Sequence, residues 1–215
     1  TINRHNFLEL DKIFDFIEAE NIDRVCFYHL VYSGRGNEMM EEDVTPEESR
    51  QAMDIIIRRT KDFEERGLKK EILTVDNHCD GVYMYVKAVQ EGDNALAEQI
   101  KKLISMNGGN RSGIAFGEVD HLGYVHPDQF TQHHTFGNVR ERKFGDIWTD
   151  VNNPIMAGLK DRKTLLKGRC QKCQYLENCN GNFRTRAEAV TGDFWESDPA
   201  CYLTDEEIGL TKGDK

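Results

Sequence analysis

The 215-residue sequence lacks the features of a secreted or membrane-embedded protein. It has no run of roughly 18 apolar residues, which a helix needs in order to span a bilayer. Its first residues, T-I-N-R-H-N, contain neither an initiator methionine nor the basic and apolar segments of a signal peptide. We therefore predict a soluble, cytoplasmic protein, and we expect the chain to begin inside a domain of a longer protein.

Negative charge also outnumbers positive charge. The chain has 28 Lys and Arg against 38 Asp and Glu, which gives a formal net charge of −10. This balance argues against a nucleic acid or an anionic membrane surface as the main partner. A hydrophobic content of 38% at this length is enough to bury a core, in one large domain or two small ones.

Four of the six cysteines are grouped near the end of the chain. Cys170, Cys173, Cys179 and Cys201 have the spacing C-x2-C-x5-C-x21-C, which can bring four sulfurs around one metal-sized object. Thiolates bind zinc or an iron–sulfur cluster, and disulfides are less expected in a reducing compartment. The single C-x2-C pair with a remote fourth cysteine favours a cluster, but zinc stays open as the alternative.

The first half of the sequence alternates helical and strand patterns. Residues 7–20 place apolar side chains on one helical face, and residues 24–32 form a β-branched and aromatic run typical of a buried parallel strand. A Thr-Pro-Glu-Glu start predicts a capped helix over residues 45–66, and residues 71–75 predict the next strand. A further amphipathic helix is expected at about residues 93–106. The pattern predicts an α/β fold whose parallel strands are joined by a helical crossover.

Two polar loops follow the predicted strands, at the end of a parallel sheet where ligands usually bind. Residues 33–36 combine two glycines with Arg35, which has the fork geometry for a carboxylate, although a plain turn fits equally well. Residues 76–80 are rich in ligand-type side chains, but Cys79 has no partner at metal-site spacing. A substrate or cofactor contact is the better interpretation of this loop. Cys26, inside the first strand, is expected to be a core thiol.

The second half of the sequence predicts shorter elements than the first. Residues 113–119 and 123–126 predict a β-hairpin, and a helix is expected over residues 180–190. His126, His133 and His134 lie close together in sequence but without the spacing of a known metal motif, so a surface or substrate-pocket role is favoured over a metal. Residues 138–143 are the one locally basic stretch, and the tail 212–215 is expected to be disordered.

Four segments in order resemble a known family. They are H-L-G-Y-V-H-P-D-Q-F, F-G-N-V-R-E-R-K-F-G-D-I-W, C-Q-K-C-Q-Y-L-E-N-C-N-G-N-F-R and D-P-A-C-Y-L-T-D-E-E-I-G. They resemble the C-terminal half of radical S-adenosylmethionine enzymes with a SPASM or twitch auxiliary-cluster domain. The likeness is greatest to the tetrapyrrole branch, and within it to the 12,18-didecarboxysiroheme deacetylase of the alternative haem pathway. The haem d1 maturation enzyme and the haem synthase that decarboxylates iron-coproporphyrin belong to the same branch.

This resemblance implies a fold and a set of cofactors. Residues 1–110 would be the C-terminal portion of a partial (β/α) barrel, and residues 111–215 a loop-rich auxiliary domain with a β-hairpin. The four cysteines would hold an auxiliary [4Fe–4S] cluster. Phe183 stands where a two-cluster SPASM domain has a further cysteine, so one auxiliary cluster is implied. The C-x3-C-x2-C motif of the catalytic cluster does not occur in the sequence, so S-adenosylmethionine and a second [4Fe–4S] cluster would be bound by the remainder of a longer parent, and the chain alone would be inactive.

The implied activity is radical removal of acetate side chains from didecarboxysiroheme, with electron transfer through the auxiliary cluster. The expected partners are an iron tetrapyrrole and an electron donor such as ferredoxin or flavodoxin. Related haem d1 or haem synthase chemistry, a peptide substrate, and a non-catalytic zinc or electron-transfer module remain alternatives. The residues proposed to contact the substrate or S-adenosylmethionine are Asn6, His29, Arg35, Asn77, Arg111, His126, His133, His134, Arg140 and Arg142.

Overall fold

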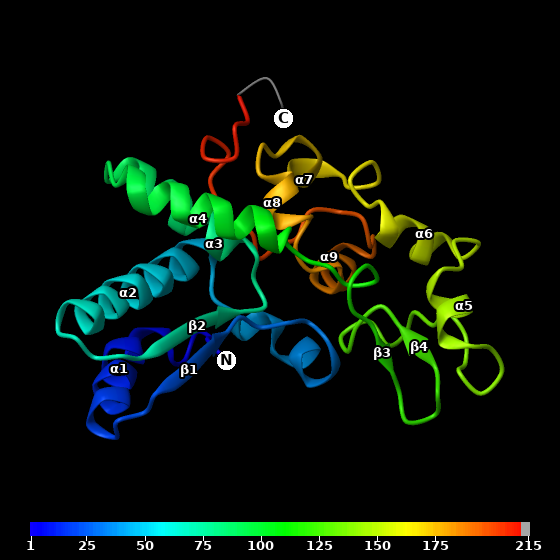
Figure 1. The fold of residues 1–215 in the computed structure, drawn as a ribbon, viewed down its shortest axis with the longest axis horizontal. Helices are drawn as coiled ribbons and strands as arrows, with labels where there is room; N and C mark the ends of the chain where they lie inside the picture. The colour runs from blue at the N-terminus through cyan, green and yellow to red at the C-terminus, as the bar shows by residue number, and fades with distance from the viewer. Residues whose placement is uncertain (212–215) are drawn as a thin grey trace.

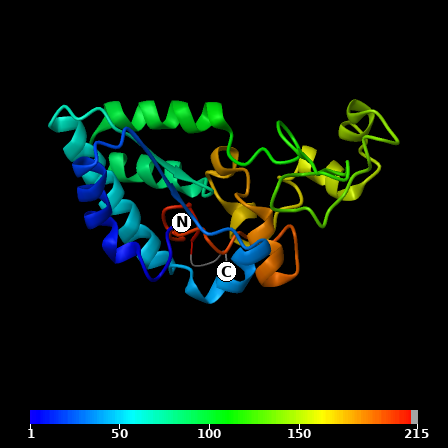
Figure 2. The same ribbon diagram turned by 90° about the horizontal axis from the view of Figure 1, so that it is seen from below.

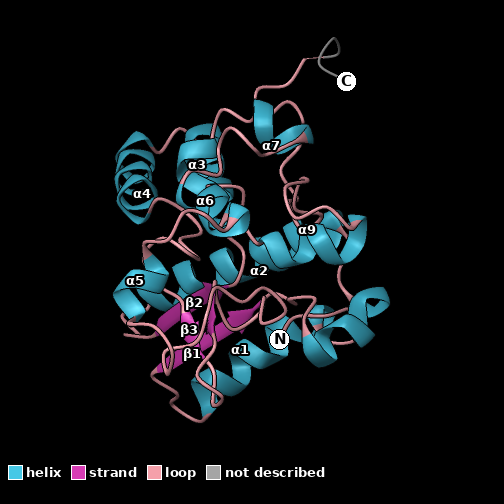
Figure 3. Ribbon diagram, turned by 90° about the vertical axis from the view of Figure 1, so that its right-hand side faces the viewer, coloured by secondary structure: helices cyan, strands magenta, loops and turns pink. Residues whose placement is uncertain are grey.

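A computed structural model describes residues 1–211 (Figure 1). The tail 212–215, predicted to be disordered, lies outside the described residues. Helices and loops make up most of the described chain, and its strands are short (Figure 3). Within residues 1–211, no helix is both long and apolar enough to cross a membrane.

The first half contains the predicted parallel strand pair. Strand β1 (Arg24–Tyr28) pairs with β2 (Glu71–Val75) in parallel register, and α2 (Pro46–Glu65) forms the crossover between them. The predicted strand over residues 24–32 is too long, because β1 ends where its partner ends. Residues 30–32 remain buried but outside the ladder, and the chain then enters the 3-10 segment η2 (Gly34–Glu42).

Four α-helices accompany this sheet. The predicted helix over residues 7–20 is a 3-10 turn η1 (Phe7–Glu9) followed by α1 (Leu10–Ala19), and the predicted capping box of α2 is present at Thr45. Helix α4 (Asn94–Asn107) matches the prediction closely. Helix α3 (Cys79–Gln90) was not predicted; it lies alongside α4.

The second half is built from short elements. The hairpin is present but small, because β3 (Glu118–Val119) and β4 (Val125–His126) contribute two residues each. Helix α9 (Arg184–Thr191) begins later than predicted, since Asn180 and Asn182 adopt positive φ angles that a helix cannot continue through. The other helices are α5 (Phe144–Trp148), α6 (Pro154–Lys160), α7 (Gly168–Lys172) and α8 (Leu176–Cys179).

Two large apolar cores hold these parts together, and a small third cluster of Ala88, Ala97 and Ile100 lies between α3 and α4. The larger includes Phe14, Phe27 and Phe63, and it takes in Tyr202 and Ile208 from the end of the chain. This final segment therefore packs among the helices of the first half, as the view from below also shows (Figure 2). The second core, built from Val125, Phe136, Ile147, Met156, Leu159 and Phe194, belongs to the second half. The division at residue 110 stays a prediction.

Candidate metal centre

The four cysteines of the C-x2-C-x5-C-x21-C pattern line one cavity of about 150 Å³. Cys170 lies in α7, Cys173 caps the C-terminus of that helix, Cys179 ends α8, and Cys201 is in the loop that returns after α9. Leu176, Leu203 and Ile208 supply apolar walls. None of the six cysteines, all within residues 1–211, is disulfide-bonded. Four soft thiols around one partly apolar cavity fit zinc or an iron–sulfur cluster.

Backbone amides point at three of these sulfurs. The amide of Tyr175 donates to Cys173 Sγ at 3.3 Å. The amides of Asp198 and Leu203 donate to the sulfurs of Cys170 and Cys201. Hydrogen bonds of this kind stabilise a ligating thiolate and help to set the potential of a cluster.

The cavity disfavours ionised thiols in the absence of a cation. Burial raises the pKa of Cys173 to about 11, and burial also raises the pKa of Cys170 and of Cys179. Cys201 differs, because a hydrogen bond from the Cys79 thiol lowers its pKa. Sulfur binds metal as thiolate, so a metal or cluster must displace protons to occupy this centre.

The third cysteine is held by a close backbone contact from the end of α4. Gly109 has φ +69°, and a Cβ at this position would lie 2.2 Å from the carbonyl carbon and oxygen of Cys179. The amide of Asn110 donates to the Cys179 carbonyl at 3.1 Å, and the Asn180 side chain donates to the Asn110 carbonyl at 2.6 Å. Glycine is therefore required at residue 109 for the two segments to meet.

A buried ion pair fastens the fourth cysteine to the first half of the chain. Arg186 and Asp198 are both fully buried and approach to 2.9 Å. Asp198 also accepts the amides of Phe183 and Ala200, each at 2.9 Å. Arg186 additionally donates to the carbonyls of Leu30 and Asp76, which follow β1 and β2. One guanidinium thus joins the loop before Cys201 to the carboxyl ends of both strands.

The loop at residues 76–80, expected to contact substrate or cofactor, packs against the cysteine centre. Asn77 is buried, donates to the carbonyl of Ala200 at 3.0 Å and accepts from the Asn182 amide group at 2.7 Å. Cys79 is fully buried and lines the same cavity as the four predicted ligands. Its proximity to them was not predicted, because spacing along the chain carries no information about a thiol about 90 residues away.

His29 belongs to a buried group of polar side chains that also includes Asp80 and Tyr202. Its Nε2 lies 3.0 Å from Asp80 Oδ2, and the Tyr202 hydroxyl donates to Asp80 Oδ1 at 2.6 Å. Burial opposes ionisation of Asp80, but the charge and hydrogen bond of His29, with hydrogen bonds from Tyr202 and Thr74, outweigh it and lower the pKa of the carboxyl group. His29 is thus tied to the residue that follows Cys201. Its predicted contact with substrate or S-adenosylmethionine stays a prediction.

The cationic residues predicted to meet substrate carboxylates lie in separate segments. Arg35 is exposed in η2, and exposed Arg111 lines a pocket together with Lys160, Arg162 and Lys163. Exposed Arg140 and Arg142 follow the hairpin. Arg142 pairs with Asp150 at 3.0 Å. Asn6 closes a local turn by donating to the Thr1 carbonyl. The roles of these residues stay predictions.

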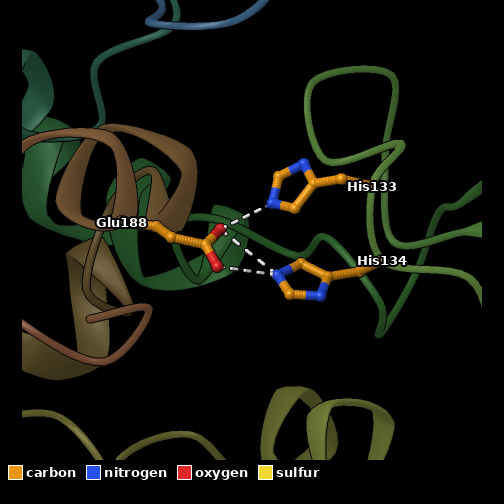
Figure 4. A group of neighbouring side chains, drawn as sticks. All are labelled: His133, His134 and Glu188. Carbon is orange, nitrogen blue, oxygen red and sulfur yellow. Dashed lines mark hydrogen bonds and ion pairs between the residues drawn. The ribbon is translucent and has the colours of Figure 1, made fainter. Parts of the chain in front are cut away.

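The three histidines behave differently from one another. His126 is buried and donates from Nδ1 to the carbonyl of His134 at 2.9 Å. The Nε2 atoms of His133 and His134 both face the Glu188 carboxylate of α9, at 2.8 and 3.0 Å (Figure 4).

Two acidic residues of the site were missed in the sequence. Glu188 lies more than 50 residues further along the chain than the histidines and was not singled out. Asp198 was also missed, although its place three residues before Cys201 is a visible signal.

No family model matches the sequence. The chain is 56% identical over 212 residues to the Fe-coproporphyrin III synthase of Methanosarcina barkeri, covering 97% of this chain and 53% of that protein. It is 39% identical over 210 residues to the pre-heme d1 synthase of Dinoroseobacter shibae, covering 97% and 52%. The AdoMet-dependent heme synthase of Methanosarcina barkeri is 27% identical, covering 94% and 54%.

The fold comparison agrees with these relatives. The solved structure of anSMEcpe with bound AdoMet, a radical S-adenosylmethionine enzyme, superimposes with a TM-score of 0.61 at 13% identity, over 96% of this chain and 52% of that one. The chain therefore spans about half the length of the proteins it matches. Over that half, it is similar to radical S-adenosylmethionine enzymes of tetrapyrrole synthesis, and its fold is similar to that of anSMEcpe.

Proposed function

We propose that the four cysteines hold an auxiliary [4Fe–4S] cluster in a radical S-adenosylmethionine enzyme that acts on an iron tetrapyrrole. The observation that carries this proposal is the convergence of Cys170, Cys173, Cys179 and Cys201 on one cavity. That convergence occurs in a chain 56% identical to an Fe-coproporphyrin III synthase. Zinc in the same four-sulfur site is the alternative occupant, and metal analysis separates the two.

The donors around the cavity are compatible with a redox role. An iron–sulfur cluster supplies one-electron transfer, and amide donors to its sulfurs help to set its potential. The amides of Tyr175, Asp198 and Leu203 are placed to do this. Apolar side chains line the cavity beside the partly buried cysteines, and the Arg186–Asp198 pair keeps the Cys201 loop against the strand ends.

The tetrapyrrole reaction rests on the relatives. We infer that the parent protein removes acetate side chains from didecarboxysiroheme by hydrogen abstraction, leaving methyl groups and an iron coproporphyrin. The relative at 56% identity is named for forming Fe-coproporphyrin III, which supports this product class. A peptide substrate has less support, because the PqqA peptide cyclase match covers only 32% of this chain. Pre-heme d1 chemistry is the second candidate, favoured by the 39% match along nearly the whole chain.

The rest of the catalytic apparatus is assigned to the remainder of the parent. S-adenosylmethionine and the catalytic [4Fe–4S] cluster would be bound there, completing a partial (β/α) barrel to which β1 and β2 contribute. An external reductant of the ferredoxin or flavodoxin class would supply electrons. His29, Arg35 and Arg111 are proposed substrate or S-adenosylmethionine contacts, together with Asn6, Asn77, His126, Arg140 and Arg142.

Turnover assays test the substrate assignment. The full-length protein, anaerobic and supplied with S-adenosylmethionine and dithionite, is offered didecarboxysiroheme, iron-coproporphyrin III or a peptide. We expect a product that has lost two acetate side chains only from the first, identified by mass spectrometry. Conversion of iron-coproporphyrin III to a decarboxylated product, with didecarboxysiroheme unchanged, would instead assign the protein to the haem synthase reaction.

A further inference from the structure

A second group of ligand-type side chains lies outside the cysteine centre. His133 Nε2 is 2.8 Å from Glu188 Oε2, and His134 Nε2 is 3.0 Å from Glu188 Oε1 and 3.2 Å from Oε2. One ligand atom from each residue lies within 4.8 Å of the others. Figure 4 shows both imidazoles reaching across from one loop to the carboxylate on α9. Two imidazole nitrogens and a carboxylate are a common ligand set for divalent transition metals.

The loop that carries the two histidines is fixed independently of Glu188. The buried Asp128 carboxylate accepts the Phe130 and Thr131 amides, each at 2.9 Å, and the Thr131 hydroxyl at 2.8 Å. The His134 amide donates to the Thr131 carbonyl at 3.0 Å, and the His134 carbonyl accepts from His126. The backbone beside both imidazoles is therefore held by buried and part-buried hydrogen bonds, as a preorganised ligand loop requires.

Helix α9 is held equally firmly on the other side. Arg186 bonds Asp198, and Arg184 donates to the carbonyls of Gly181, Phe194 and Glu196. Both arginines are buried. Glu188 thus projects from a rigid element toward a rigid loop, and neither element depends on the histidine–carboxylate contact for its position. Within residues 1–211, the Glu188 carboxylate makes its polar contacts with these two imidazoles.

We propose that His133, His134 and Glu188 form a binding site for a divalent transition metal ion of the zinc class. The nitrogen–oxygen separations of 2.8 and 3.0 Å are hydrogen-bond distances, and ligands of a tetrahedral ion with bonds of about 2.0–2.2 Å lie about 3.3–3.6 Å apart, so the side chains need to separate by only about half an ångström to admit the ion. His133 is 56% exposed, so solvent can complete the coordination. The site differs in chemistry from the cysteine centre, because its ligands are imidazole and carboxylate without sulfur. Its occupancy would join the loop after the hairpin to α9.

The test uses zinc as the probe and the protein with its cysteine centre already loaded. The protein carries no polyhistidine tag, is treated with chelator under anaerobic conditions, and is dialysed against buffered Zn²⁺. We expect one zinc per chain in addition to the iron. We expect zinc affinity to fall at least about tenfold in Glu188→Gln and in His134→Ala. Loss of a residue that only hydrogen-bonds a metal ligand costs about 10–100-fold in metal affinity, and loss of the ligand itself should cost no less. Iron and sulfide contents should not change.

A matched control and a second readout make the result decisive. His121→Ala removes an exposed histidine of the hairpin loop and should leave zinc binding unchanged. Zinc-edge X-ray absorption should show only nitrogen and oxygen ligands with imidazole scattering. Equal zinc affinity in wild type and Glu188→Gln, no zinc retained by the wild type, or sulfur in the zinc shell would each overturn the proposal. His133→Asn provides an independent variant, expected to lose zinc likewise, should Glu188→Gln lose iron as well.

Discussion

The buried pair of Arg186 and Asp198 should be the strongest single electrostatic link between the cysteine centre and the strand ends. Both side chains have an exposed fraction of 0%. Replacing Arg186 with Met leaves the Asp198 carboxylate buried without its counter-charge, which costs about 3–5 kcal/mol of folding free energy. The carbonyls of Leu30 and Asp76 also lose a donor, so we expect the upper part of that range.

The measurement is urea unfolding of the metal-free, reduced protein. With a slope of about 2 kcal/mol per molar urea, the predicted loss moves the midpoint down by about 2 M. Arg142→Met is the matched control, because Arg142 is 46% exposed and its pair with Asp150 should contribute less than about 1 kcal/mol. In the double variant Arg186→Met with Asp198→Asn no uncompensated charge remains, so its loss should be smaller than the sum of the two single losses.

One result would refute this reasoning directly. If Arg186→Met lowers the unfolding free energy no more than Arg142→Met does, the buried pair does not hold the Cys201 loop. Additive losses in the double variant would show that the two side chains act independently, against the 2.9 Å contact between them.

Three further predictions concern single groups. Burial raises the pKa of Cys173 to about 11, so the unfolded chain loses the thiol proton at lower pH than the folded chain does. The metal-free protein should therefore lose stability as pH rises from about 9 to 11. A melting temperature that stays constant over this range would contradict the raised pKa. Gly109→Ala should abolish iron loading, since the added Cβ would lie 2.2 Å from backbone atoms of Cys179. Gly108→Ala is the control, because Gly108 has a similar φ angle but a Cβ there would meet nothing within 4 Å, so this variant should load iron normally. Equal iron loading of the two variants would show that the close approach of residue 109 to Cys179 is not needed. Tyr202→Phe removes the 2.6 Å hydrogen bond to Asp80 and should cost about 1–3 kcal/mol in chemical denaturation, and a loss below about 0.5 kcal/mol would mean that the carboxylate finds another donor.

The features predicted correctly from the sequence depend on residues that are close to one another in the chain. The capping box at Thr45 and the apolar spacing of α4 involve residues within one or two helical turns. Cys170, Cys173 and Cys179 are likewise close in sequence, and the structure places them with Cys201 around one cavity, while their role as metal ligands stays a prediction. Strand β1 shows the limit of such patterns, since its apolar run continues to Tyr32 while its pairing ends with β2.

The features that were missed depend on contacts between distant residues. Arg186 meets the carbonyl of Leu30 across 156 positions, and Glu188 meets His133 across 55. Cys79 lines the cysteine cavity because α3, which begins at Cys79, packs against α8. Such pairs leave no periodic signal in the sequence, because their proximity is set by how helices and loops pack and not by spacing.

The central claim is that the four cysteines hold an iron–sulfur cluster, and metal analysis tests it most directly. Iron, sulfide and zinc are measured anaerobically, with electron paramagnetic resonance of the reduced protein, for the wild type and for Cys173→Ala. The account predicts about four irons and four sulfides per cysteine centre in the wild type, and their loss together with a reduced-cluster signal in the variant. One zinc bound by the cysteines, with no sulfide after anaerobic reconstitution, would contradict it.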